Sequence, residues 1–324
     1  MGERHLGLIL LRMAMALGSA VALGQSEPGL TPPPPPPPLP AVAPKPPPAL
    51  TTLRCFDPLA APAFWNPLPA PAADGAPVKP FQAQLPPGFL DPQDPLTRQL
   101  VREYGATLVS RGDVARPVTM IFPDEAAVTA WQSGVSAKEV VIGGVKVTLQ
   151  AAAMAALQEA LAEAAKTKLA ISPTGADAAR RTYAGTVINW KSRVDAGLVH
   201  WQAAKKLAPA DAAAIRSLTP AGQIPRILAL EEQGLCFAKS LDKTILRSVA
   251  APGSSQHVFM LALDVRQHAD PRVRALLARH GWFQTVVTDE PHFTYLGADA
   301  AGLPALGLKP VKARGRDYWV PDID

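Results

Sequence analysis

Two histidines and an aspartate in the last quarter of the 324-residue chain have the side chains that catalytic zinc sites use. His257 follows Ser255 and Gln256, Asp264 comes seven residues later, and His292 lies in the segment Asp-Glu-Pro-His-Phe. Two neutral imidazoles and one carboxylate can hold zinc and leave its fourth position open for water. In a straight strand, residues about 3.3 Å apart would keep His257 far from Asp264, so a shared site requires a bend or bulge. The spacing taken by itself favours ordinary structural surface residues over a metal site.

Several such pieces occur in a fixed order towards the end of the chain. They are Ser255-Gln-His257, Asp264, the Gly-Trp-Phe of 281–283 and Asp289-Glu-Pro-His292. Together they resemble the zinc D-alanyl-D-alanine carboxypeptidases and the related L-alanyl-D-glutamate endopeptidases, which cut peptidoglycan stem peptides. The resemblance covers residues 146–297, and its specific part is the C-terminal end of that range.

The resemblance implies a role for each residue of the pattern. His257, Asp264 and His292 match the three zinc ligands, and Asp289, three residues before the last ligand, matches the general base. The form Asp-x-Pro-His-Phe looks more like the endopeptidase branch, because carboxypeptidases more often have Glu-x-Trp-His. Glu290 is adjacent to Asp289 but out of register, so it is the second choice.

The family also carries an arginine that stabilises the developing oxyanion. Arg181 matches it best and Arg180 is the alternative, while two solvent-facing arginines on a helix remain the structural interpretation. The sequence departs from the family at Met260, where the family has Gly, at Thr186, where it has Gln, and over 173–178. A helical insertion also separates Arg181 from His257. These departures leave substrate identity more open than metal binding.

Hydrophobic periodicity and turn residues predict the elements that must position these side chains. We expect a helix opening at 123, where Pro and acids suit a first turn, and a hairpin over 140–147 broken by Gly143 and Gly144. Short strands should flank Asp289 and His292. The other expected strands are 118–122 and 258–265, and the other expected helices are 95–104, 149–166, 177–192, 194–206, 223–234 and 271–280.

Helices followed by a few short strands indicate an α+β fold. From the resemblance we expect helices packed on a small antiparallel sheet that carries the zinc site, as in Hedgehog and DD-peptidase-like domains, with an extra N-terminal α/β subdomain. The expected boundaries are a signal peptide at 1–24, a proline-rich linker and arm at 25–93, a small accessory α/β region at 94–145, the zinc peptidase domain at 146–300 and a C-terminal tail at 301–324.

The N-terminal quarter has the composition of an exported, tethered protein. Arg4 and Arg12 precede or interrupt a short apolar segment over 13–23, and small residues before Gln25 offer a cleavage site. Residues 28–50 hold 13 of the 36 prolines, which predicts an extended polyproline spacer. We therefore expect secretion, in a bacterium to the periplasm. In that compartment Cys55 and Cys236 could form a disulfide, although two buried thiols are the alternative.

Composition limits the classes of partner. The formal net charge of +5 is spread thinly, with no basic stripe, which argues against nucleic acid. No apolar run is long enough for a buried membrane span. The leading hypothesis is an exported zinc metallopeptidase that acts on peptidoglycan peptides. The alternatives are a non-catalytic wall-binding module that keeps the peptidase fold, and an interaction protein with a structural metal site. Oligomeric state stays open.

Overall fold

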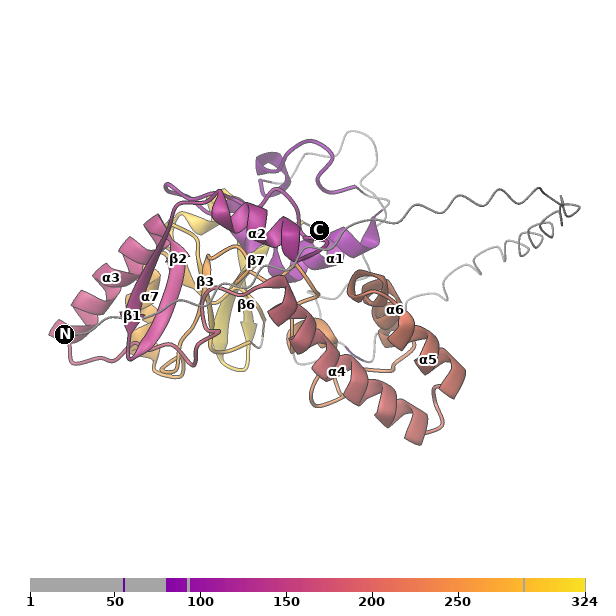
Figure 1. Cartoon of the computed structure of the whole chain (residues 1–324). Helices are drawn as coiled ribbons and strands as arrows, with labels where there is room; N and C mark the ends of the chain where they lie inside the picture. Colours follow the sequence, from indigo (N-terminus) through magenta and orange to yellow (C-terminus); the bar gives the residue numbers. More distant parts are fainter. Residues whose placement is uncertain (1–54, 56–79, 92–93, 288, 324) are drawn as a thin grey trace, which may run out of the picture. The chain divides into compact units, whose positions relative to one another are not determined.

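The computed structural model describes residues 55, 80–91, 94–287 and 289–323 (Figure 1). All of them belong to one unit, 49–324. The predicted signal peptide and most of the predicted proline-rich arm therefore lie outside the described residues. The described elements are helices and small antiparallel sheets, as expected for an α+β fold. Within the described part of the chain, no helix is both long and apolar enough to cross a membrane.

The first described elements are η2 (Gln82–Gln84), α1 (Pro95–Tyr104) and η3 (Gly105–Val109). The helix predicted over 95–104 is confirmed, and it begins where the Asp94 carboxylate accepts a hydrogen bond from the N–H of Thr97 at 3.1 Å. Phe81, which precedes η2, is fully buried in the same apolar cluster as α1. This end of the predicted arm is thus part of the core.

The strand predicted over 118–122 is wrong, because these residues form no ladder. The Thr119 hydroxyl oxygen accepts from the N–H of Ile121, closing a local turn. The N–H of Phe122 donates to the carbonyl of Gly253 at 3.0 Å, in the loop before the histidine motif. Gly253 has φ +76°, and a Cβ there would lie 2.0 Å from the Phe122 oxygen, so only glycine allows this approach.

The next four elements follow the predicted order: α2 (Glu125–Ser133), β1 (Ala137–Ile142), β2 (Val145–Gln150) and α3 (Ala151–Lys166). The hairpin prediction is confirmed, since β1 pairs with β2 and the turn glycines have φ of +56° and +80°. Asp124 caps α2 by accepting from the N–H of Ala127. Both strands contact α3, which in turn contacts α7.

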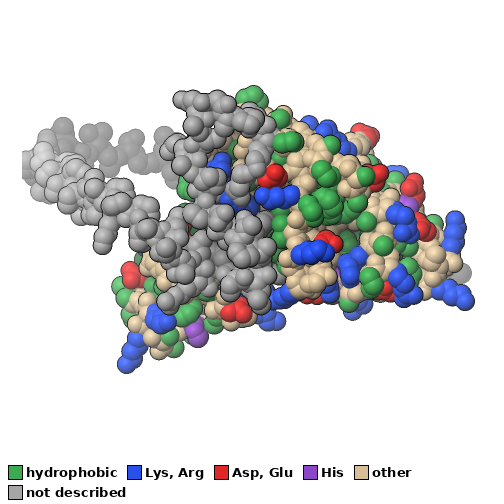
Figure 2. Space-filling model, turned by 180° about the vertical axis from the view of Figure 1, so that it is seen from behind, with side chains coloured by type: hydrophobic (Ala, Val, Ile, Leu, Met, Phe, Trp, Pro, Cys, Tyr) green, Lys and Arg blue, Asp and Glu red, His purple; other side chains and the backbone are tan. Residues whose placement is uncertain are grey.

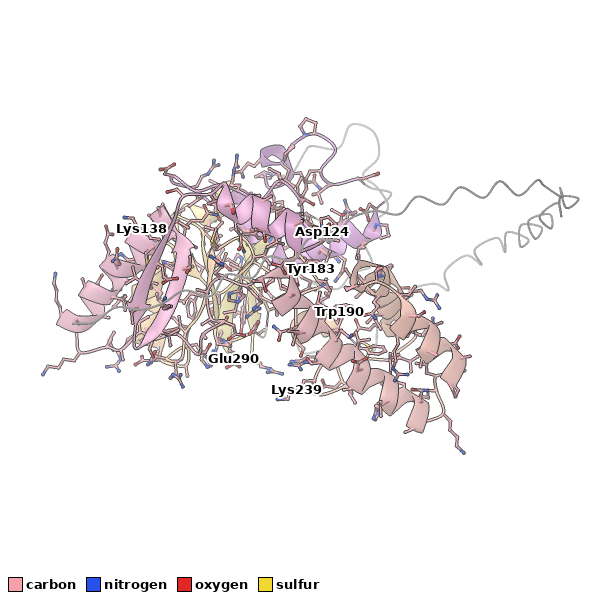
Figure 3. The ribbon with its side chains drawn as sticks, in the orientation of Figure 1. Asp124, Lys138, Tyr183, Trp190, Lys239 and Glu290 are labelled. Atoms are coloured by element: carbon pink, nitrogen blue, oxygen red, sulfur yellow. A yellow bond between two sulfur atoms is a disulfide. The ribbon has the colours of Figure 1, made fainter. Side chains whose placement is uncertain are left out.

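A helical segment follows, with α4 (Tyr183–Ala203), α5 (Pro209–Ser217) and α6 (Pro220–Glu232). The two helices predicted over 177–192 and 194–206 are wrong as such. One helix, α4, replaces them, and it begins only at Tyr183, where the Thr182 hydroxyl accepts from the N–H of Gly185. The prediction over 223–234 is confirmed by α6, while α5 was not predicted. Figure 3 labels Tyr183 and Trp190 on α4.

Two contacts fix this helical segment in place. The indole N–H of Trp190 donates to Gln223 on α6 at 3.2 Å, and α5 contacts both neighbouring helices. The indole of Trp201 donates to the carbonyl of Cys236 at 3.0 Å. Cys236 forms a disulfide with Cys55, which decides between the two alternatives left open by the sequence. The arm is therefore covalently attached just after α6.

A three-stranded sheet in the order β3-β5-β4 carries the predicted site residues. It consists of β3 (Ala262–Asp264), β4 (Trp282–Phe283) and β5 (His292–Tyr295), with α7 (Pro271–Arg279) between β3 and β4. The helix prediction for 271–280 is confirmed. The strand predicted over 258–265 is too long, because residues 257–260 form turns.

The remaining elements are η4 (Ile245–Arg247), η5 (Leu303–Leu306), β6 (Leu308–Ala313) and β7 (Arg316–Pro321). β6 and β7 form an antiparallel hairpin whose N–H at Trp319 donates to the carbonyl of Gln284 at 2.9 Å. No helix or strand was expected in this segment from the sequence. The hairpin also contacts α1, so residues 308–321 pack against the first helix.

Two large apolar clusters form the core. One contains buried side chains of α1, α4, α5 and α6, and the other contains buried side chains of β2, α3, α7 and the three-stranded sheet. The face seen in Figure 2 has Lys and Arg side chains interspersed with acidic and apolar ones. On that face, the positive charge is not gathered into a stripe.

Glu231 places a carboxyl group in the first of these clusters and should make stability depend on pH. It is 1% exposed, and its Oε1 accepts from the N–H groups of Phe237 and Ile245, at 3.0 and 2.7 Å. Thr244 donates its hydroxyl proton to Oε2 at 2.6 Å. Burial raises the pKa of Glu231 from 4.5 to about 7, despite these hydrogen bonds.

Because the folded pKa is raised, the stabilisation is complete below pH 4.5 and is lost as the pH rises through about 7. Glu231→Gln keeps the shape and the acceptor oxygen but removes the titration. We expect the free energy of unfolding of the variant, minus that of the wild type, to be up to about 3 kcal/mol larger at pH 8 than at pH 5. Urea titrations at several pH values measure this, with the exposed Glu232→Gln as matched control. A difference that does not change with pH would contradict the prediction.

Candidate metal centre

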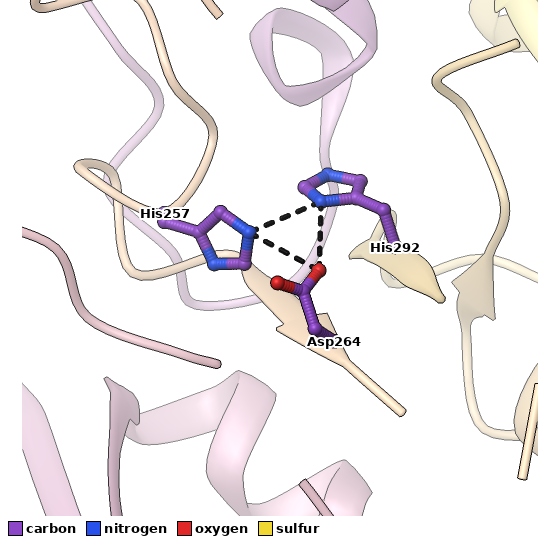
Figure 4. Close-up of side chains that lie close together, drawn as sticks. All are labelled: His257, Asp264 and His292. Atoms are coloured by element: carbon purple, nitrogen blue, oxygen red, sulfur yellow. Dashed lines mark hydrogen bonds and ion pairs between the residues drawn. The ribbon is translucent and has the colours of Figure 1, made fainter. Parts of the chain in front are cut away.

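The structure brings His257, Asp264 and His292 together around one point (Figure 4). His292 Nδ1 lies 3.1 Å from His257 Nε2 and 3.2 Å from Asp264 Oδ1, and His257 Nε2 lies 3.3 Å from the same oxygen. Asp264, the last residue of β3, pairs directly with His292, the first residue of β5. Sheet register therefore holds two members of the group side by side.

A bend supplies the third member. The N–H of Met260 donates back to the carbonyl of His257 at 3.2 Å, and Met260 has φ +55°, in the left-handed region. This turn ends the irregular segment before β3 begins, and it brings the side chain of His257 close to that of Asp264. A glycine at this position would adopt such a φ without strain, whereas for a residue with a Cβ it costs roughly 1–2 kcal/mol. Met260 is 1% exposed, and the burial of its side chain offsets that cost.

The His257 ring is oriented by a backbone carbonyl. Its Nδ1 lies 2.8 Å from the oxygen of Ala179, which can only accept, so Nδ1 carries the proton. The lone pair of Nε2 then faces Asp264. The loop that provides Ala179 is itself attached to the site, because the N–H of Asp264 donates to the Ala178 carbonyl and the N–H of Arg181 donates to the His257 carbonyl.

The His292 ring is oriented by Gln256, and here the nitrogen that carries the proton is Nε2 and not Nδ1. Its Nε2 lies 2.8 Å from Gln256 Oε1, and the Gln256 amide nitrogen donates to the carbonyl of Tyr104 at 2.8 Å. That second bond fixes which end of the amide is oxygen, so His292 Nε2 is the donor and Nδ1 faces the centre. Thr285 and Thr294 also bond to Gln256, which is fully buried.

These assignments fit a metal ion. With both ring protons directed outwards, two lone pairs face each other across 3.1 Å beside a carboxylate oxygen, an arrangement that a cation stabilises. A tetrahedral zinc ion with bonds of about 2.0–2.2 Å holds its ligand atoms about 3.3–3.5 Å apart. The observed separations of 3.1, 3.2 and 3.3 Å are close to that spacing. Outward imidazole N–H groups bonded to carbonyl oxygens are also the usual second contacts of metal-binding histidines.

The charges of the group favour ligands in their metal-binding form. Burial lowers the pKa of His257 to about 4, against the opposing effect of Asp264, so the imidazole is neutral near pH 7. Burial acts to raise the pKa of Asp264, but attraction to any proton on the facing nitrogens of His257 and His292 holds that pKa well below its usual range. The carboxylate is therefore ionised.

Arg181 lies beside the group, in the loop before α4 and not within a helix. Its Nη2 is 3.7 Å from Asp264 Oδ2 and 3.8 Å from Asp177 Oδ2, and its buried Nε has no hydrogen-bond partner among the described residues. Arg180 is exposed. Of the two arginines considered from the sequence, the structure places Arg181 next to the predicted ligands.

Asp289 and Glu290 point to different surroundings. Asp289 lines the same cavity as the three-residue group, and burial raises its pKa to about 6. Glu290, labelled in Figure 3, instead pairs with Arg316 Nη2 at 2.8 Å and lies 3.8 Å from His268 Nδ1. Of the two carboxylates, Asp289 is the one that lines the cavity of the histidines.

The cavity has a volume of about 210 Å³, and α4 forms part of its wall. Thr186 lies there, with its hydroxyl accepting from the N–H of Gly253 at 3.1 Å. Sequence reasoning missed several lining or supporting residues, namely Tyr104, Asn189, Arg193 and Gln256. For Gln256 a signal existed, since it directly precedes the histidine of the motif. The others come from segments in which the sequence shows no functional motif.

Comparison with known proteins finds only distant likeness. No protein-family model matches the chain, and no curated protein matches it. One similar solved structure is a variant of the vancomycin resistance D,D-pentapeptidase VanY from a VanB-type resistance cassette, in complex with Zn(II): 17% identity, 63% of this chain and 94% of that chain covered, TM-score 0.35. Another is VanYB in complex with D-alanine-D-alanine: 17% identity, 54% and 84% covered, TM-score 0.31.

Gln256 should govern metal affinity without binding the metal. Gln256→Leu removes the acceptor that fixes the His292 ring, and we expect zinc affinity to fall about 10- to 100-fold. Gln256→Glu keeps an acceptor and should retain affinity. Competition with a chromophoric chelator measures this, with exposed Gln233→Leu as control and circular dichroism to verify folding. A folded Gln256→Leu chain with wild-type affinity would refute the assignment.

Proposed function

We propose that this protein is an exported zinc metallopeptidase that hydrolyses peptide bonds in peptidoglycan stem peptides. The observation that carries the proposal is the tetrahedral spacing of His257, Asp264 and His292 in one cavity with Asp289 and Arg181. The sequence resemblance supplies the substrate class. Under this proposal residues 146–300 are a DD-peptidase-like domain, 94–145 an accessory region and 301–324 a tail.

The residues around the group divide the chemical work. Zinc, when bound, supplies a Lewis acid and makes water easier to deprotonate near neutral pH. Asp289 takes the proton of the attacking water onto its carboxylate and passes it to the leaving amine. Arg181 places a guanidinium where negative charge develops on the substrate carbonyl oxygen, and it is held there by Asp264 and Asp177.

Export is the second part of the proposal. Residues 1–24 would be removed as a signal peptide and 25–93 would serve as a linker and arm. The Cys55–Cys236 disulfide supports an oxidising compartment, because such bonds form and persist outside the cytosol.

Thiol trapping in intact cells tests export. We expect both cysteines to resist alkylation by a maleimide until a reductant is added. We also expect added protease to degrade the protein when the outer membrane is opened but the cytoplasmic membrane is intact. The matched control is a chain lacking residues 1–24, which should stay inside and react at once. Reduced cysteines in the full-length protein, protected with the cytoplasmic fraction, would exclude export.

Two adjacent acids test the peptidase. Asp289→Asn should keep one zinc per chain but lose about 10²- to 10⁴-fold in kcat/KM on muropeptides, because it removes the proton acceptor. Glu290→Gln should stay close to wild type, since that carboxylate is engaged with Arg316. His257→Ala should lose both zinc and activity. Release of D-alanine and of crosslink products is followed by chromatography of digested sacculi.

The same experiment separates the alternatives. A zinc-loaded wild-type chain that sediments with sacculi but leaves their muropeptide profile unchanged would favour the non-catalytic wall-binding module. A chain that binds neither zinc nor sacculi would refute the proposal as a whole.

A further inference from the structure

One wall of the metal cavity comes from α4, the helix that separates Arg181 from the histidine motif. Thr186, Asn189 and Arg193 all line the cavity. Their spacing of three and then four residues places them on one face of the helix. At about 1.5 Å per residue, that face extends about 10 Å along the helix axis. The cavity therefore continues along α4. The helix begins close to Arg181, and of the three residues Arg193 is the furthest from that end.

Arg193 is held in place but its charge is not balanced by a neighbour. Its Nε donates to the Ser248 hydroxyl and its Nη1 to the Ser192 hydroxyl, each at 2.9 Å. Among the described residues, no hydrogen-bond acceptor contacts Nη2, and no carboxylate forms an ion pair with the guanidinium. Ser248 also lines the cavity. A neutral hydroxyl thus fixes the orientation of this cation without neutralising it.

Arg181 makes a useful contrast within the same cavity. It lies within 4 Å of two carboxylates, Asp264 and Asp177, so its charge is shared with the protein. Arg193 has no such partner among the residues described. A half-buried guanidinium with its Nε fixed and Nη2 available is suited to a carboxylate, because charge-assisted bonds to a planar fork are strong and directional.

We propose that Arg193, oriented by Ser248, binds a carboxylate of the substrate that is distant from the bond being cut. Asn189 lies between Thr186 and Arg193 on the same face, and its side-chain amide, which has no hydrogen-bond partner among the described residues, contacts the peptide on the way. The substrate class is therefore an anionic peptide that lies along α4. This inference rests on the proposed peptidase function for the identity of the peptide, but the carboxylate site stands on the cavity alone.

Binding of peptides that differ in one charge tests the site. The probes are a stem pentapeptide with all carboxylates free and the same peptide with each carboxylate amidated in turn. Calorimetry uses the full zinc-loaded chain carrying Asp289→Asn, so that turnover does not interfere. We expect Arg193→Gln to weaken binding of the free peptide about 10- to 100-fold. It should have no effect on the peptide whose matching carboxylate is amidated.

Two further variants show how Arg193 acts. Ser248→Ala frees the guanidinium and should give a smaller loss with the same dependence on the carboxylate. Lys191→Gln removes an exposed charge from α4 outside the cavity and should bind like the parent. In a chain with Asp289 intact, Arg193→Gln should raise KM and leave kcat largely unchanged, which loss of catalytic geometry would not do.

The outcomes separate this inference from the proposed function. If peptides are hydrolysed normally while Arg193→Gln binds every probe like its parent, the carboxylate site is refuted alone. If no peptide is cleaved but amidation weakens binding only in chains that have Arg193, the site stands and the peptidase proposal fails. A chain that binds none of the probes overturns both.

Discussion

The site depends on which nitrogen of each imidazole carries the proton. A carbonyl oxygen at Ala179 and an amide oxygen at Gln256 each take one ring N–H, so both remaining lone pairs face the Asp264 carboxylate. Burial lowers the pKa of His257 and so keeps that ring neutral near pH 7. Much of the surrounding structure serves these two bonds: the loop before α4 provides the carbonyl, and the backbone at Tyr104, at the end of α1, fixes the amide. Ala179, Gln256 and Tyr104 are far apart in the sequence, but all three serve to keep the ring protons pointing away from Asp264.

The sequence predicted the side chains of the metal site better than it predicted the backbone that brings them together. His257, Asp264 and His292 were found from type and order, and the need for a bend between the first two followed from strand geometry. The bend itself was missed, because nothing in the segment Val-Phe-Met-Leu indicates a turn: Met260 takes a left-handed φ that local preference disfavours. Tertiary contacts enforce that conformation.

Other errors have the same origin. Residues 118–122 are mostly β-branched or apolar, as strand residues often are, but their hydrogen bonds go to a local hydroxyl and to Gly253. The helix expected from 177 begins six residues later, because the intervening loop is used to contact β3 and His257. The hairpin glycines, the Asp caps of α1 and α2, and the helices 95–104 and 271–280 were predictable, since each depends on residues close in sequence. Arg193 was not, since its role depends on what the fold places opposite it, and for Gln256 the sequence offered only its position next to His257.

The pairing of Asp264 with His292 has an evolutionary consequence. Register, and not the number of residues between them, keeps these two side chains on the same face, because a slip by one residue would turn one of them away. The intervening segment, with α7 and β4, can therefore lengthen or shorten among relatives without disturbing the pair. Searches that demand a fixed spacing between these two residues will miss such relatives, whereas searches for the paired strand ends will retain them.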